Sequence, residues 1–424
     1  MTIKLLQAKI PRGKLYHSLF DSVRYLFSCA FVNLNDKSRV ECFEKAFSAY
    51  CGKSYAIAFP KARVALWFYL KALNLPKGAK VLMPPITIKG MLDVVVDLEL
   101  EPIYSDLELN SAIPLLSQVM GIVHQHKPKV CLITPLFGVS PEIIPLISFL
   151  SENHIKVVID FSHCLNCTDS GHLLSTLGDL SIYSSSSIKT LDTLGGGLAL
   201  TNSHSDYLIL KEFQQSLRRT KRILLLRKAF INLIRNLLTS RSVFSLFTYS
   251  MIQLFSRIYP SYMLRQTGTR SKVRFKDSLP IEWFDKFSSV QALIGLELLH
   301  RVSNQDAQRI HNATQIIKAT NREYFLRTPC NNRSVYWQLL YFVDSPIHAK
   351  IFFAERNIDV ASTSLSLISS LDEYPNHTLL ENANKIYNNS IFIPCFSSLT
   401  RLDVCNLIDA VNAYNASRPS VELE

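Results

Sequence analysis

Glycine is scarce in this sequence, with 13 glycines among 424 residues, less than half of the roughly 7% that is usual in proteins. This scarcity excludes collagen-like repeats and glycine-rich linkers. Charged residues are also few, at 19%, whereas 48% of the residues are hydrophobic. Such a composition excludes a disordered chain. The length predicts two or three domains and allows a hydrophobic core of ordinary size.

No disulfide framework, metal cluster or membrane anchor is evident in the sequence. Nine cysteines are an odd number, and their spacing is not that of a disulfide scaffold. The single C-x-x-C, Cys164 to Cys167, has no second pair that would complete a zinc site, so we expect no metal. Reduced thiols predict a cytoplasmic protein. The first residues lack the apolar core of a signal peptide.

Acidic residues are missing from one long segment. Residues 213–276 hold no Asp or Glu but 14 Lys and Arg. The whole chain has a net charge of +12, so the rest of it is nearly neutral, at −2. The charge therefore belongs to one basic insertion, and we expect catalysis from the neutral remainder.

Two interpretations of this insertion stay open. Residues 218–238 alternate bases with Leu, Ile and Phe, and residues 242–256 carry no charge. As a helix, the second stretch would span about 22 Å, short of a bilayer core of roughly 30 Å. Residues 218–262 are therefore either a basic amphipathic surface that binds anionic membranes, at the inner membrane face, or an ordinary helical pair packed on the body. No nucleic-acid-binding motif accompanies the bases, so we expect no nucleic-acid partner.

Strands and helices alternate between residues 50 and 202. Apolar strands are predicted at 80–83, 102–104, 129–135, 156–160, 180–184 and 197–201, with helices at 89–98 and 141–152. This order is typical of an α/β domain with a mainly parallel sheet. Because ligands gather at the carboxyl ends of parallel strands, we expect Asp106, Pro135, Asp160 and Ser184 to converge on one site.

The domain organisation follows from these changes of pattern. An amphipathic helix is predicted at 288–301, continuing to about 318, with strands at 336–342 and 390–393 and a last helix at 402–416. We divide the chain into an N-terminal arm (1–49), a large α/β domain (50–212), the basic helical insertion (213–280) and a small α+β domain (281–424).

Several motifs in the large domain fall in a recognisable order. Lys61-Ala62-Arg63 opens a helix, Asp160 and His163 follow a buried strand, and Ser184 ends the next strand. Lys189 lies five residues after Ser184 and eight before the last glycine of Gly195-Gly196-Gly197. Residues 43–203, and more weakly those from 288 on, resemble the DegT/StrS sugar aminotransferases, which are fold-type I pyridoxal 5'-phosphate (PLP) enzymes.

The resemblance implies a role for each residue. Lys189 matches the lysine that forms a Schiff base with the PLP aldehyde and then carries protons. Asp160 matches the carboxylate at the pyridine nitrogen, and His163 the residue beside the ring. Ser184 matches the phosphate-binding serine, next to the helix N-terminus at Lys61, Ala62 and Arg63.

Four positions depart from the family pattern. Lys61-Ala62-Arg63 stands for the family's Ser-Gly-Thr or Ser-Gly-Arg, and Leu194 begins the glycine run in place of Gly-Glu. Ile88 stands where an aromatic residue is expected to cover the cofactor ring. Phe284-Asp285-Lys286 replaces the family's Asn-x-Arg, whose Asn reaches the cofactor phosphate in the partner subunit. Lys61 and Arg63 are candidates to replace the charge of this cross-subunit clamp.

The predicted function is a PLP-dependent aminotransferase of surface-polysaccharide or amino-sugar biosynthesis. The resemblance implies a homodimer that moves nitrogen from glutamate to a keto-sugar linked to a nucleotide. Relatives that dehydrate sugars carry His in place of the lysine, so Lys189 favours transamination. Two alternatives are a catalytically degenerate PLP fold that acts as a binding or scaffold protein, and an aminotransferase for a lipid-linked substrate at the membrane.

Overall fold

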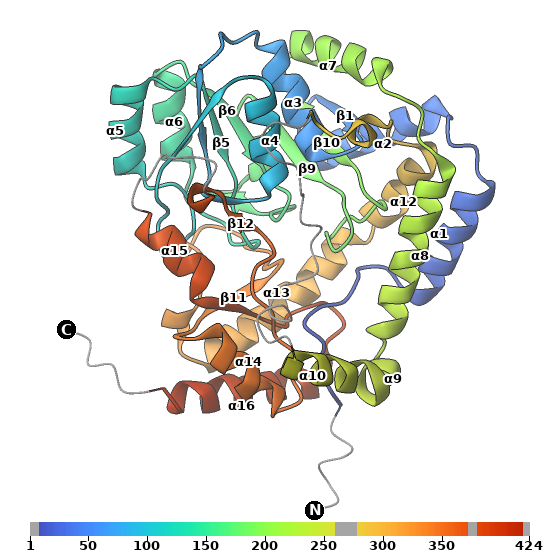
Figure 1. The fold of residues 1–424 in the computed structure, drawn as a ribbon, viewed down its shortest axis with the longest axis vertical. Helices are drawn as coiled ribbons and strands as arrows, with labels where there is room; N and C mark the ends of the chain where they lie inside the picture. The colour runs from blue at the N-terminus through green and yellow to red at the C-terminus, as the bar shows by residue number, and fades with distance from the viewer. Residues whose placement is uncertain (1–7, 259–277, 372–379, 419–424) are drawn as a thin grey trace, which may run out of the picture.

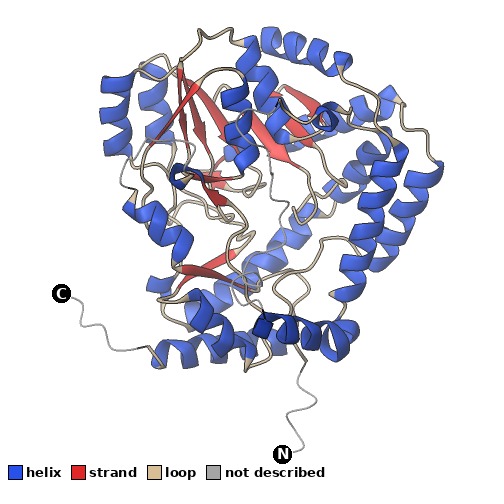
Figure 2. Cartoon of the chain, in the orientation of Figure 1, coloured by secondary structure: helices blue, strands red, loops and turns tan. Residues whose placement is uncertain are grey.

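A computed structural model describes residues 8–258, 278–371 and 380–418. A seven-stranded sheet lies at the centre of its larger part, with helices on both faces (Figures 1 and 2). Alternate residues of each strand enter different hydrophobic clusters: Cys131 and Ile133 belong to one, and Val130 and Leu132 to the other. This alternation explains why the sheet strands are apolar along their whole length.

The strand order in this sheet is β1-β10-β9-β6-β5-β2-β4. Strands β4, β2, β5, β6 and β9 are parallel, whereas β10 pairs antiparallel with both β9 and β1. The strands are β1 Tyr55–Phe59, β2 Lys80–Met83, β3 Ile86–Thr87, β4 Glu101–Tyr104, β5 Val130–Ile133, β6 Lys156–Asp160, β7 Thr168–Asp169, β8 His172–Leu173, β9 Leu180–Ser184, β10 Gly197–Thr201, β11 Leu339–Phe342, β12 Ser366–Leu367 and β13 Ser390–Ile393. The predicted α/β class with a mainly parallel sheet is confirmed.

Helices cover this sheet and build the small domain. They are α1 Leu19–Phe31, α2 Lys37–Cys51, α3 Ala62–Ala72, α4 Lys89–Asp97, α5 Leu116–His126, α6 Ile144–Glu152, α7 His204–Ser216, α8 Arg222–Leu238, α9 Arg241–Val243, α10 Tyr249–Ile258, α12 Ser289–Leu299, α13 Val302–Ala319, α14 Pro346–Ala354, α15 Glu381–Asn388 and α16 Arg401–Ala416. Capping boxes at Ser18, Ser288 and Thr400 fix the start of α1, α12 and α16. The predicted helix over 288–318 is two helices, because the chain turns at His300 and Arg301.

The small domain has its own hydrophobic cluster. Its antiparallel pair β11–β13 packs with α13, α14 and α16. The N-terminal segment joins it, since Ile10 forms a parallel bridge with Ile358 and is buried in the same cluster. The first described residues, around Ile10, are therefore fixed on the small domain before α1 returns to the large one (Figure 1).

The insertion forms helices that pack on the body of the protein. Helix α8 lies alongside α1 at one edge of the molecule, and α9, a π-helical turn at Phe244–Thr248 and α10 follow near the small domain (Figure 1). No helix in the described ranges is both long and apolar enough to cross a membrane. Residues 259–262 of the predicted membrane-binding stretch lie outside the described residues.

One of the four predicted strand-end positions has a different role. Asp106 follows β4, but its carboxylate accepts hydrogen bonds from the backbone N–H groups of Asn382 (3.0 Å) and Ala383 (2.9 Å) at the start of α15. It also accepts one from Leu107 N–H at 2.8 Å. The expectation that Asp106 joins the other strand ends in one site is wrong, because the carboxylate is used as a helix cap.

A fully buried arginine ties the parts together. Arg309 on α13 donates to Val335 O (2.6 Å), to the Tyr16 hydroxyl (2.7 Å) and to Thr190 Oγ1 (3.3 Å). It also forms an ion pair with Asp306, and both side chains are wholly buried. Arg309 thus links the N-terminal segment, the small domain and the residue next to Lys189.

We expect Arg309→Met to lower the free energy of unfolding by about 3–5 kcal/mol, because Asp306 would be left buried without its partner. Urea unfolding of the intact protein measures this change. The exposed Arg322 is the matched control, and Arg322→Met should change the value by less than about 0.5 kcal/mol. Equal stability of the two variants would contradict the structural role of Arg309.

Candidate active site

Residues 185–196, which we call the lysine loop, connect β9 to β10 and contain Lys189. The strand register pairs Gly197 with Ser184 on one side and with Phe59 on the other. The end of β9, the start of β10 and the end of β1 therefore lie side by side. Gly197 therefore lies between Ser184 and the turn that begins at Lys61, the two predicted phosphate anchors.

Asp160 lies at the end of β6 and is 5% exposed. Its Oδ1 atom accepts hydrogen bonds from the backbone N–H (3.1 Å) and the hydroxyl of Ser162. Ser162 Oγ in turn accepts a hydrogen bond from the backbone N–H of Ser184, at 2.8 Å. Burial raises the pKa of Asp160, while Ser162 and Lys189 act in the opposite direction. Asp160 Oδ2 receives no hydrogen bond from the described residues, so it is free for a ligand.

Lys189 is buried, at 8% exposure. Burial lowers the pKa of its amine to about 7, although the negative charge of Asp160 acts to raise it. The amine lies 3.9 Å from the centre of the Trp337 ring and has no hydrogen-bond or ion-pair partner in the described part of the chain. At neutral pH much of this amine is therefore uncharged, which a nucleophilic lysine requires.

His163 lies beside Trp337, with the two ring centres 4.1 Å apart and the planes 24° from parallel. The backbone N–H of Phe137 donates to His163 Nδ1 at 3.2 Å, which makes Nδ1 an acceptor. Burial, and after it the charge of Lys189, holds the pKa of His163 well below its usual range. The imidazole is consequently neutral, and its ring stacks against those of Trp337 and Phe137.

The predicted phosphate turn carries cations at the start of α3. Lys61 is the N-cap residue of this helix, and its side chain makes no capping hydrogen bond. Burial first, and then the positive charges of Lys228 and Arg63, lowers the pKa of Lys61 to about 7. Arg63 lies over the Trp283 ring at 4.5 Å. The free N–H groups of the first turn include Ala62, next to which Gly197 packs so closely that a Cβ on it would lie 2.1 Å from Ala62 N.

The aromatic side chain at this site was missed by the sequence reasoning. Ile88, at the position predicted to cover the cofactor ring, precedes α4, is partly buried and packs against the core cluster of the sheet. The ring that contacts His163 and Lys189 is Trp337, which also donates from Nε1 to Ile188 O at 3.0 Å. Trp337 is 148 residues from Lys189 in sequence, and no local pattern signals that they meet.

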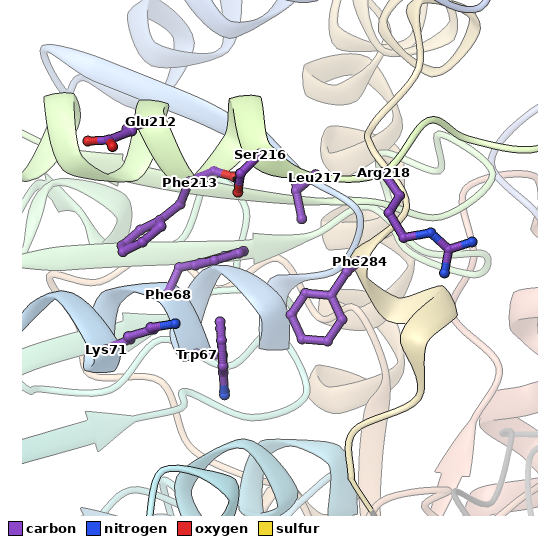
Figure 3. A pocket seen from close by; sticks show the side chains of 9 residues that line it. All are labelled: Trp67, Phe68, Lys71, Glu212, Phe213, Ser216, Leu217, Arg218 and Phe284. Carbon is purple, nitrogen blue, oxygen red and sulfur yellow. Dashed lines mark hydrogen bonds between the residues drawn. The ribbon is translucent and has the colours of Figure 1, made fainter.

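Two hollows adjoin this part of the molecule. A cavity of about 340 Å³ opens beside Ile188 and Trp337 and is lined mainly by apolar side chains, with Arg235 of α8 and Lys14 among the charged ones. A second hollow of about 390 Å³ lies between α3 and α7, with an aromatic lining that includes Phe68, Phe213 and Phe284 (Figure 3). None of the predicted site residues lines either hollow. The first is lined by Ile188, the neighbour of Lys189, and by Trp337, whose ring contacts the Lys189 amine, so the first is the candidate substrate pocket.

The residues present fit PLP. Lys189 offers an amine whose pKa burial lowers to about 7, and Asp160 offers a carboxylate oxygen that has no hydrogen-bond donor among the described residues. The aromatic rings of His163 and Trp337 stack on each other within the same site. Ser184 pairs with Gly197, which packs against the cationic first turn of α3, where a phosphate dianion would be stabilised.

The lowered pKa of Lys189 predicts a pH dependence for its reaction with aldehydes. The attacking form is the uncharged amine, so the rate of attachment of pyridoxal should rise as the pH approaches about 7 and be level above it. An ordinary lysine would continue to gain rate up to a pKa of about 10.4. Borohydride trapping followed by mass spectrometry measures attachment at Lys189, and a rate that still rises tenfold per pH unit in alkaline buffer would contradict the prediction.

Comparison with known proteins agrees with this geometry. Residues 32–222 match the model of the DegT/DnrJ/EryC1/StrS aminotransferase family. The spore coat polysaccharide biosynthesis protein SpsC of Bacillus subtilis is 25% identical over 171 residues, which are 40% of this chain and 43% of that protein. The GDP-perosamine synthase of Vibrio cholerae is 23% identical over 39% of this chain and 44% of its own. This chain thus covers less than half the length of these relatives.

Solved structures extend the likeness to the whole fold. The sugar aminotransferase CalS13 of Micromonospora echinospora has a TM-score of 0.72 and 16% identity, covering 95% of this chain and 99% of its own. Its likeness shows a shared fold, which is the predicted fold-type I. Enzymes of the matched family use PLP, in agreement with the predicted cofactor. The predicted resemblance is therefore confirmed, since residues 32–222 of this chain match the model of the DegT/DnrJ/EryC1/StrS aminotransferase family.

Proposed function

We propose that this protein is a PLP-dependent aminotransferase that transfers an amino group to a keto-sugar in amino-sugar or surface-polysaccharide biosynthesis. The observation that carries the proposal is the buried amine of Lys189, whose pKa burial lowers to about 7, within one site with Asp160 and His163. Glutamate as the donor and a homodimeric state are proposed on the family resemblance. A nucleotide-linked sugar is the proposed acceptor, with SpsC and GDP-perosamine synthase as the supporting relatives.

Each residue has a defined task in this proposal. PLP, when bound, supplies the capacity to stabilise negative charge on the carbon that carries the nitrogen. Asp160 Oδ2 would hold a proton on the pyridine nitrogen, and the neutral ring of His163 would pack beside it. The Lys189 amine would first hold the cofactor and then, once displaced by substrate, move a proton at the substrate carbon as general base and acid.

The acceptor is proposed to enter the cavity beside Ile188 and Trp337. Its volume of about 340 Å³ lies within the range of small-molecule sites. Arg235 and Lys14 line this cavity and have no ion-pair partner in the described ranges, so they suit the diphosphate of a nucleotide-linked substrate. The apolar walls equally suit a lipid-linked diphosphate, which is the alternative acceptor.

Single-turnover reactions test the proposed activity. Protein loaded with PLP should convert glutamate to its keto acid, and Lys189→Ala should lower the rate about 10²–10⁴-fold, because the proton-transfer group is lost. Borohydride should trap PLP on Lys189 in the unaltered protein, whereas Lys189→Ala should give no such adduct. The exposed Lys385 is the matched control, and Lys385→Ala should keep full activity. PLP binding without turnover would identify the degenerate binding protein instead.

A further part of the proposal concerns location: residues 218–262 bind anionic membranes at the cytoplasmic face. Most of the large apolar side chains that are exposed in the described ranges belong to α1, α8 and residues 244–258. No acidic residue occurs between Glu212 and Asp277. Along the insertion, this face therefore combines apolar side chains with positive charges and carries no negative charge. Such a surface has the chemistry that binds headgroups of anionic lipids.

Sedimentation with vesicles tests the membrane proposal. The protein should bind phosphatidylserine vesicles more than neutral ones, and salt should weaken the binding. Leu246 and Phe247 are 83% and 59% exposed, so replacing both by Ser should reduce binding several-fold by the loss of apolar contact. The control is Leu402→Ser, at a 63% exposed residue of α16. Equal partitioning of all three proteins, or a change in oligomeric mass with the double variant, would contradict membrane binding.

A further inference from the structure

One face of helix α8 is turned toward the lysine loop. Leu225, Ala229, Asn232 and Asn236 are buried, and their spacing of three or four residues defines a single stripe. Asn232 accepts a hydrogen bond from Ser187 Oγ (3.0 Å). The same side chain donates to Asp192 Oδ2 (2.8 Å), so it holds the lysine loop on both sides of Lys189.

The other end of this stripe is held as well. Asn236 donates to His17 O at 2.9 Å and to Ser22 Oγ at 2.7 Å, on the N-terminal segment and α1. Two buried asparagines one turn apart therefore fix both the rotation of α8 and its position along its axis. This fixes the direction of Lys228, which lies one turn before Asn232 on the same side of the helix.

Lys228 reaches the glycine run. Its Nζ lies 2.8 Å from the point that a Cβ on Gly195 would occupy, and Gly195 has a φ of +96°. A side chain at Gly195 would therefore require both a strained backbone and displacement of the ammonium group. Two residues later, the backbone of Gly197 contacts Ala62 N. The Lys228 ammonium and the N-terminus of α3 thus flank the same three glycines.

The two lysine amines that meet here, Lys61 and Lys228, interact with nearby carboxylates only from a distance. Lys228 and Arg63 both lower the pKa of Lys61, after the effect of burial itself. Burial lowers the pKa of Lys228, which Asp192 and Asp285 act to raise from a distance. Neither lysine amine has an ion pair or a hydrogen bond in the described ranges of the chain. A protein that holds such cations together at a helix N-terminus is prepared for a phosphate dianion.

The segment that replaces the family's partner-reaching motif is bound within its own chain. Lys286 N–H donates to Arg218 O at 2.6 Å, and Lys286 Nζ donates to Gln215 O at 2.6 Å. Asp285 pairs with Arg218 at 3.8 Å. These contacts tie residues 285–286 to the residues just before α8, so this segment helps to position α8.

We propose that Lys228 binds the phosphate group of the cofactor, so that the insertion completes the phosphate site from within the same chain. This inference rests on the proposed function, because it assumes that PLP is the ligand. It assigns to the insertion a direct part in cofactor binding. The other phosphate ligands would be Ser184 and the first turn of α3.

Paired ligands test the assignment. Lys228→Met should weaken PLP binding to the intact protein by about 10–100-fold, the loss expected for one hydrogen bond to a charged group. It should leave the affinity for pyridoxal, which lacks the phosphate, unchanged. Lys228→Arg should restore most of the PLP affinity, and Arg227→Met, at the exposed neighbouring residue, should have no effect. Equilibrium dialysis measures all of these affinities.

Mixing variants tests whether the lysine acts within its own chain. Lys189→Ala chains and Lys228→Met chains are co-expressed so that mixed oligomers form. If Lys228 acts within its own chain, borohydride should trap no more PLP in the mixture than in Lys228→Met alone. Recovery of trapping would mean that Lys228 serves a partner's site and would overturn the same-chain assignment. Equal PLP affinity of Lys228→Met and unaltered protein, or an equal loss for PLP and pyridoxal, would overturn the phosphate role. Unaltered protein that binds neither PLP nor pyridoxal would overturn the proposed function itself.

Discussion

The whole site depends on holding one amine in a desolvated place on a loop without regular structure. Burial of Lys189 keeps its pKa at about 7, and a loop that moved would readmit water and restore the ordinary charge. Contacts from distant parts of the chain prevent this. Arg309 bonds Thr190, Asn232 bonds Asp192, and Trp337 bonds the carbonyl of Ile188. The N-terminal segment, the insertion and the small domain are all organised around this loop.

Helix α8 changes the meaning of the positive charge found in the sequence. In the sequence the excess charge lies outside the nearly neutral remainder, from which we expected catalysis. The structure differs, because Lys228 faces the glycine run and Arg235 lines the cavity beside Trp337. The exposed apolar residues of the same helix still face outward. One helix therefore combines an inner polar stripe with an outer apolar face, which explains why its bases are interleaved with Leu, Ile and Phe.

The sequence predicted the parts of the fold and site that depend on local pattern. Apolar strands that end in Asp160 and Ser184 indicated a parallel sheet with ligands at its edge, and the spacing to Lys189 indicated the lysine of a PLP enzyme. Trp337 and Lys228 could not be predicted, because each meets the lysine loop through tertiary packing across many residues. Asp106 was misassigned for a related reason: strand-end position alone does not distinguish a ligand from a cap for a distant helix.

The hydrogen bonds of Asn232 have a consequence for how such an insertion is inherited. They fasten α8 to Ser187 and Asp192, which lie within the family region, while α8 itself begins where that region ends. The helix is thus not a detachable module. Transferring this helix to a relative would require that Ser187, Asp192 and Gly195 be transferred too. Removing it would leave the Asp192 carboxylate and the Ser187 hydroxyl without the Asn232 amide that they bind. Substitutions in α8 and in the lysine loop therefore have to occur together.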